Sequence, residues 1–175
     1  QESDLFVEAL TRNGKIGESR TLTLAERVVA EKTAIFGVRS PELATSLDNL
    51  GVLSSARGEF AKAVSTHEQA LAIRRQSNDP ALADTLERLA LPLIWLERFP
   101  EAQRYLDEAR RIREPLSATA ALALGRTLYL QALLNRWDGH YSSAAPALNQ
   151  VLETRRVLAP HHPDSVQVFV VNGDL

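Results

Sequence analysis

Apolar residues recur every three or four positions along most of the chain, which is the spacing of one face of an α-helix. The clearest run is a set of four leucines: Leu43, Leu47, Leu50 and Leu53. A strand would instead alternate apolar and polar residues, and no such pattern of useful length precedes Val166. The pattern therefore predicts an all-α chain.

Helix boundaries follow from turn residues between these apolar runs. Ser40-Pro41 and Asp79-Pro80 are typical of helix starts, because Ser and Asp are good N-caps and proline is tolerated at the first helical position. Arg57-Gly58 is typical of a helix end, where glycine adopts the left-handed conformation. The predicted helices form four pairs: 3–13 with 17–36, 40–57 with 60–77, 79–96 with 99–113, and 117–137 with 141–158. A further helix begins at 163–171.

A six-residue sequence motif recurs at the start of the second helix of each pair. It runs Gly-Glu-Phe-Ala-Lys-Ala at 58–63 and Gly-His-Tyr-Ser-Ser-Ala at 139–144. Its last small residue is Ser19, Ala63, Ala102 and Ala144 in turn, so the repeats are 44, 39 and 42 residues apart. Periods of this length indicate a helical repeat array, in which neighbouring pairs stack to bury a continuous core.

These residues resemble the tetratricopeptide repeat (TPR) of the long-repeat, kinesin-light-chain-like type, which is found in many bacterial regulatory proteins. In that family small residues lie where the two helices of a pair cross. The small residues that match are Gly51, Ala63 and Ala70, then Ala90, Ala102 and Ala109, then Ala132 and Ala144. The stretch Leu-Asp-Asn-Leu-Gly at 47–51 is similar to the family's Leu-Asn-Asn-Leu-Ala.

The resemblance implies one right-handed α-α superhelix spanning residues 1–175. Its repeats would cover about 3–36, 40–77, 79–113 and 117–158, with the truncated first helix of a fifth repeat at 163–171. It also implies a module that binds a partner protein or peptide in the concave groove lined by the first helices. The alternative from a different class is a regulatory or oligomerisation segment of a larger protein, with catalytic or DNA-binding parts elsewhere.

Composition excludes several kinds of partner and chemistry. The net charge of −2 gives no electrostatic reason to expect binding to nucleic acid or an anionic membrane. The absence of cysteine excludes disulfides and thiol catalysis. No apolar stretch approaches the about 20 residues of a membrane span. We expect a soluble chain, cytoplasmic rather than secreted.

Candidate catalytic and metal-binding residues are few. His67 lies on the apolar face of its predicted helix, which favours a packing role. A metal site at His161-His162 is not favoured, because no further cluster of metal-ligating residues accompanies them. No Gly-rich phosphate loop, metalloprotease His pair or nucleophile elbow occurs. We therefore expect no enzyme activity, no catalytic residue, no cofactor and no metal.

The family's groove positions transfer by register from the small residues of each first helix. The groove residues expected on this basis are Asp48 and Asn49, then Asp84, Glu87 and Arg88, then Arg126, Tyr129 and Arg136. The groove would be acidic in the middle and basic, with one aromatic, toward the C-terminal end. Such a surface suits a charge-split partner segment whose binding weakens with salt.

Arginine pairs near the ends of successive second helices allow two interpretations. The pairs are Arg74-Arg75, Arg110-Arg111 and Arg155-Arg156. They would form a basic stripe for an acidic partner, or they would complement the helix macrodipole and cover apolar surface with their stems. A second association surface would be the terminal repeat faces, where a homo-oligomer would bury the apolar side of an uncapped repeat.

Overall fold

The computed structural model describes residues 19–113, 118–140, 142–143, 146 and 149. The predicted helices at 3–13 and 163–171, and most of that at 141–158, lie outside the described residues. The described part contains six α-helices and no strand. They are α2 (Ser19–Phe36), α3 (Pro41–Ala56), α4 (Phe60–Ser77), α5 (Leu82–Trp95), α6 (Phe99–Arg113) and α7 (Ala118–Trp137). The predicted all-α class is confirmed.

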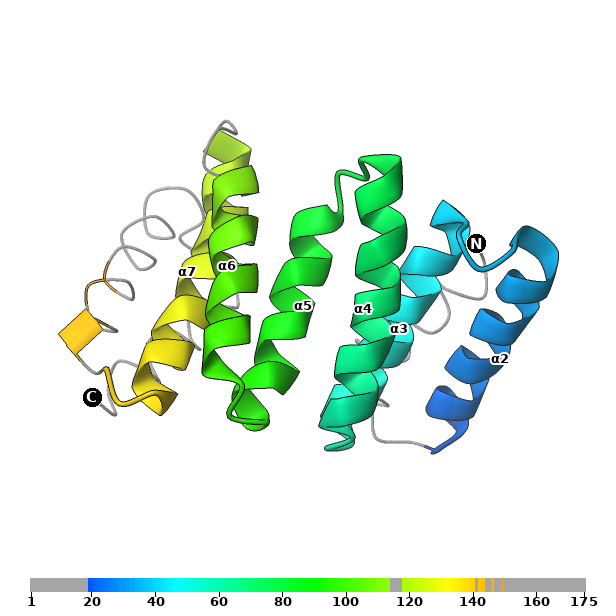
Figure 1. The fold of residues 1–175 in the computed structure, drawn as a ribbon, viewed down its shortest axis with the longest axis horizontal. Helices are drawn as coiled ribbons and strands as arrows, with labels where there is room; N and C mark the ends of the chain where they lie inside the picture. Colours follow the sequence, from blue (N-terminus) through cyan, green and yellow to red (C-terminus); the bar gives the residue numbers. More distant parts are fainter. Residues whose placement is uncertain (1–18, 114–117, 141, 144–145, 147–148, 150–175) are drawn as a thin grey trace. The chain divides into compact units, whose positions relative to one another are not determined.

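The chain divides into two compact units between Leu96 and Glu97. In the first unit, α2, α3, α4 and α5 pack in order along the chain, and each helix reverses the direction of the one before it (Figure 1). In the second unit, α6 packs against α7. The prediction of a single array over 1–175 stays a prediction.

The core of the first unit is built from the periodic apolar face seen in the sequence. Leu43, Ala44 and Leu47 of α3 pack with Ala70 and Ile73 of α4, and all five are buried. A neighbouring cluster joins α2 to α3, and its buried members are Ala25, Leu50 and Leu53. Small alanines at these contacts let the helices approach closely.

Helix ends mostly follow the predicted turn residues. Gly58 has φ +77° after α3, Gly139 has φ +79° after α7, and Asn78 adopts the left-handed conformation after α4. The start of α5 differs from the prediction, because the helix begins at Leu82 and not at 79. The Asp79 carboxylate accepts a hydrogen bond from the Ala81 N–H at 2.8 Å, which closes a turn before the helix starts.

Candidate functional site

Two of the acidic residues assigned to the groove are buried in the first unit. Asp48 of α3 is 0% exposed and Glu87 of α5 is 1% exposed. Neither carboxylate reaches the surface, so the acidic character expected in the middle of the groove rests on Asp84, which is half-buried. The other expected residues of this unit, Asn49 and Arg88, lie on the same two helices.

The Asp48 carboxylate is the centre of a buried polar network between three helices. Its Oδ1 lies 3.0 Å from the His67 Nδ1 of α4. Its Oδ2 accepts hydrogen bonds from Arg74 Nη2 at 3.0 Å and from Thr85 Oγ1 of α5 at 2.7 Å. Because a buried carboxylate is costly unless it is paired and hydrogen-bonded, these partners explain how Asp48 is tolerated in the core.

Arg74 is the largest departure from the sequence interpretation. It lies in the last turn of α4, as expected, but it is buried and points inward. Its guanidinium also donates to the Asp79 carboxylate and, at 3.4 Å, to Thr45 Oγ1. This residue therefore belongs to the core network, not to a solvent-facing basic stripe. The sequence contained one indication of this inward position. Arg74 follows His67 by seven residues, which places both side chains on one face of α4.

His67 occupies the space that Gly51 leaves empty. The imidazole is 1% exposed, and a Cβ added at Gly51 would lie 2.5 Å from His67 Cε1. The packing role predicted for His67 is confirmed. The small residue at position 51 accommodates this ring, whereas the family pattern suggested contact with another small residue.

Opposing effects act on the pKa of Asp48. Burial raises it, but the hydrogen bond from His67, the charge of Arg88, the charge of His67 and the Thr85 hydroxyl together lower the pKa below its ordinary value. The carboxylate is therefore held in its charged form.

Arg88 connects the buried network to the surface of α5. Its Nη1 lies 3.8 Å from Asp48 Oδ2, while 28% of its side chain stays exposed. On α3, the Asn49 Nδ2 atom is buried and has no hydrogen-bond partner in the described structure. Of these two groups, only the Arg88 guanidinium is accessible at the surface.

The expected residues on α7 lie in the second unit. Arg126 is exposed, whereas Tyr129 and Arg136 are half-buried. In the first unit, Trp95 at the end of α5 stacks on Phe60 of α4, with ring centroids 5.8 Å apart and planes 9° apart. This contact packs the end of α5 against the start of α4.

Comparisons with known proteins identify the architecture. Residues 8–76 match the family model described as tetratricopeptide repeat. The nearly identical TPR-like repeats of a candidate kinesin light chain from Podosopora anserina match with a TM-score of 0.75 and 20% identity, covering 99% of this chain and 86% of that one. BtubC (BKLC) from P. vanneervenii matches with a TM-score of 0.77 and 17% identity, covering 92% of this chain and 65% of that one. No curated protein matches.

This is a tetratricopeptide-repeat fold. The predicted resemblance to kinesin-light-chain-like repeats is confirmed by these neighbours. The chain spans less than two thirds of the length of BtubC. Tetratricopeptide repeats are generally non-catalytic scaffolds that bind proteins or peptides.

The described residues of this TPR fold contain no group of three or more His, Cys, Asp or Glu that would hold a metal ion. None of their helices combines the length and the apolar character needed to cross a bilayer.

Proposed function

We propose that this chain is a protein-interaction module whose first helices bind an extended segment of a partner protein. The observation that carries the proposal is the placement of Arg88. Its guanidinium is held near the buried Asp48 and remains partly exposed on α5. A charge fixed in this way loses less side-chain entropy on binding than a free surface arginine.

Neighbouring polar groups on the same unit support this proposal. Asp84 of α5 is half-buried, like Arg88, and lies four residues before it on the same helix. Asp84 and Arg88 differ in charge, so a partner segment with both an acidic and a basic side chain would match them. The exposed and half-buried residues Arg126, Tyr129 and Arg136 offer a second, mainly basic surface on α7 of the other unit.

A capture experiment tests the proposal. Wild-type chain and an Arg88→Glu variant, both shown to be folded by circular dichroism, serve as baits in lysate of the source cells, with mass spectrometry as readout. We expect a partner that the wild type retains and the variant loses, with affinity for the purified partner lowered roughly tenfold. Higher salt should weaken the wild-type complex.

The matched control is Arg39→Glu, which reverses an exposed arginine in the turn between α2 and α3. It should retain the same partner as the wild type. Equal retention by all three baits would place the binding surface elsewhere and overturn the proposed groove.

A role in assembly is the second candidate, and one observation favours it. Three large apolar side chains around the end of α2 are exposed, namely Ile35 at 72%, Phe36 at 52% and Val38 at 67%. Exposed apolar groups that lie together mark association sites more often than isolated ones do. The two roles are compatible, because Arg88 lies on α5 and these three residues lie at the end of α2 and just beyond it.

A further inference from the structure

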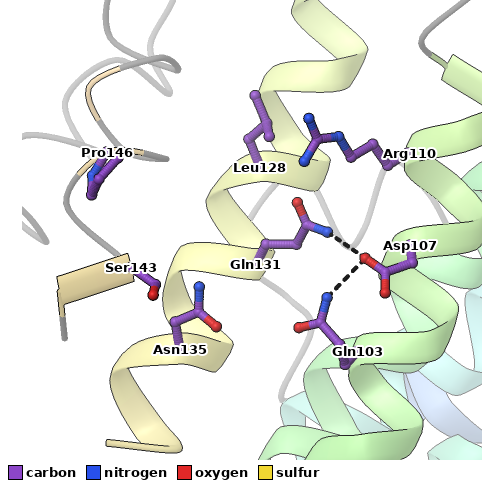
Figure 2. Close-up of a pocket in the computed structure, with 8 residues that line it drawn as sticks. All are labelled: Gln103, Asp107, Arg110, Leu128, Gln131, Asn135, Ser143 and Pro146. Carbon is purple, nitrogen blue, oxygen red and sulfur yellow. Dashed lines mark hydrogen bonds between the residues drawn. The ribbon is translucent and has the colours of Figure 1, made fainter. Parts of the chain in front are cut away.

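A pocket in the second unit lies between α6, α7 and the segment that follows α7. Its volume is about 430 Å³, within the range of ligand pockets in proteins. Figure 2 shows its lining side chains, which are mostly polar. They are Gln103, Asp107, Arg110, Leu128, Gln131, Asn135, Ser143 and Pro146.

This pocket is on a different face of α7 from the expected groove residues. Leu128, Gln131 and Asn135 follow helical spacing and share one face of α7. At about 100° per residue, the centre of that face lies about 140° around the helix from the centre of the face that holds Arg126, Tyr129 and Arg136. The pocket is therefore distinct from the surface invoked in the proposed function.

A carboxylate organises the polar groups of the pocket. Asp107 Oδ1 accepts hydrogen bonds from Gln103 Nε2 at 2.8 Å and from Gln131 Nε2 at 3.0 Å (Figure 2). These bonds fix both amides, and they leave the two amide oxygens as acceptors. No described residue donates to Asp107 Oδ2, and Asp107 is exposed. One face of this carboxylate is thus available to a cation.

The spacing of the amides matches an extended peptide. Gln131 and Asn135 are four residues apart on α7, which is a rise of about 6 Å. Every second residue of an extended chain advances by about 6.6 Å, close to the same value. Side-chain amides both donate and accept, so they can pair with the N–H and C=O groups of a peptide backbone. Gln103 and Asp107 repeat this four-residue spacing on α6.

We propose that this pocket is a second peptide site, which binds an extended partner segment carrying one Lys or Arg side chain. The amides of Gln103, Gln131 and Asn135 pair with its backbone, and Asp107 Oδ2 accepts the cationic side chain. Arg110 lines the end of the pocket near Leu128 (Figure 2).

The probe is the capped peptide acetyl-Ala-Ala-Lys-Ala-Ala-amide, titrated into the full ¹⁵N-labelled chain. Side-chain amide signals of Gln103, Gln131 and Asn135 report directly on the pocket in nuclear magnetic resonance spectra. We expect saturable shifts of these signals. A peptide with norleucine in place of lysine should bind on the order of fivefold more weakly. A peptide methylated at its backbone nitrogens should bind more weakly as well, because its N–H donors are gone.

Two variants test the residues named. Asp107→Asn keeps an oxygen that accepts from both glutamines but removes the charge, so it should abolish the preference for lysine over norleucine. Asn135→Ala should weaken the lysine peptide on the order of fivefold. Glu68→Gln and Gln69→Ala are matched controls on the exposed face of α4, and both should bind like the wild type.

Three results would overturn the proposal. They are unshifted amide signals, equal binding of the lysine, norleucine and methylated peptides, and an Asp107→Asn variant that retains the lysine preference. Arg88→Glu should leave these titrations unchanged, since Arg88 lies in the other unit. Failure of the groove proposal and failure of this one are thereby distinguished.

Discussion

At the scale of single residues, the contact between Gly51 and His67 explains why a glycine occurs in the middle of α3. Glycine in a helix interior costs about 1 kcal/mol relative to alanine, so its presence there needs a reason from packing. The His67 ring supplies it, because the added Cβ would approach Cε1 to 2.5 Å. The ring is restrained in turn by its contact with Asp48 at 3.0 Å.

We expect Gly51→Ala to lower the free energy of unfolding by about 1–3 kcal/mol, although alanine is the better helix former. Urea denaturation followed by circular dichroism measures the change. In a His67→Ala background the new methyl group enters vacated space, so the same substitution should stabilise by about 1 kcal/mol. An equal loss in both backgrounds would show that the ring is not the cause.

At the scale of helices, Asp48 joins α3 to α4 and α5 through polar contacts in the core. His67 and Arg74 approach it from α4, and Thr85 and Arg88 approach it from α5. Apolar contacts tolerate small shifts between helices, whereas hydrogen bonds require defined distances and directions. The network therefore fixes how these three helices are aligned.

This arrangement makes stability depend on pH in the acid range. The pKa of Asp48 is lowered in the folded chain, so its stabilising effect is complete above the unfolded value of about 3.9 and is lost as pH falls through the folded pKa. Wild-type unfolding free energy, measured by urea denaturation between pH 2 and 7, should fall below about pH 4.

Asp48→Asn should cost about 3–5 kcal/mol at pH 7, because it leaves Arg74 without one carboxylate partner in the core. It should also show a shallower acid dependence than the wild type. Glu68→Gln is the matched control, since it makes the same acid-to-amide change on an exposed position of α4. Parallel pH curves for the wild type and Asp48→Asn would show that Asp48 does not carry the dependence.

At the scale of the whole molecule, the chain presents surfaces suited to different kinds of contact. On α5, Asp84 and Arg88 are partly exposed and charged, the α6–α7 pocket combines amides with a carboxylate, and the end of α2 is apolar. Polar surfaces favour segments recognised by hydrogen bonds, whereas an apolar cluster favours association by burial.

We expect Ile35, Phe36 and Val38 to support self-association, with a second copy burying the same cluster. Light scattering at increasing concentration should give a mass above that of one chain. Ile35→Asp with Phe36→Asp should return the monomer mass. Ala72→Asp, on an exposed position of α4, serves as the charge control and should behave like the wild type. A wild-type monomer at all concentrations would count against the assembly role.

Individual residues show which features of the candidate site could be predicted from the sequence and which could not. Helical register correctly placed Asn49, Asp84 and Arg88 on first helices, because register depends only on spacing along one helix. Register did not reveal that Asp48 and Glu87 are covered, because burial depends on the neighbouring helix. The sequence alone was compatible with a surface role for Arg74 at the end of its helix. Its buried position follows from Asp48 of α3, whose carboxylate accepts a hydrogen bond from Arg74.

The sequence by itself determined the described helices, their approximate ends and the repeat, since these follow from local periodicity and turn residues. Its resemblance to a known family identified the tetratricopeptide fold. Only the tertiary structure decided which polar side chains face one another. It placed His67, Arg74 and Thr85 around one buried carboxylate, and it closed a polar pocket between α6 and α7. The physical reason is that hydrogen bonds and burial depend on distances between residues far apart along the chain, which periodicity within one helix does not encode.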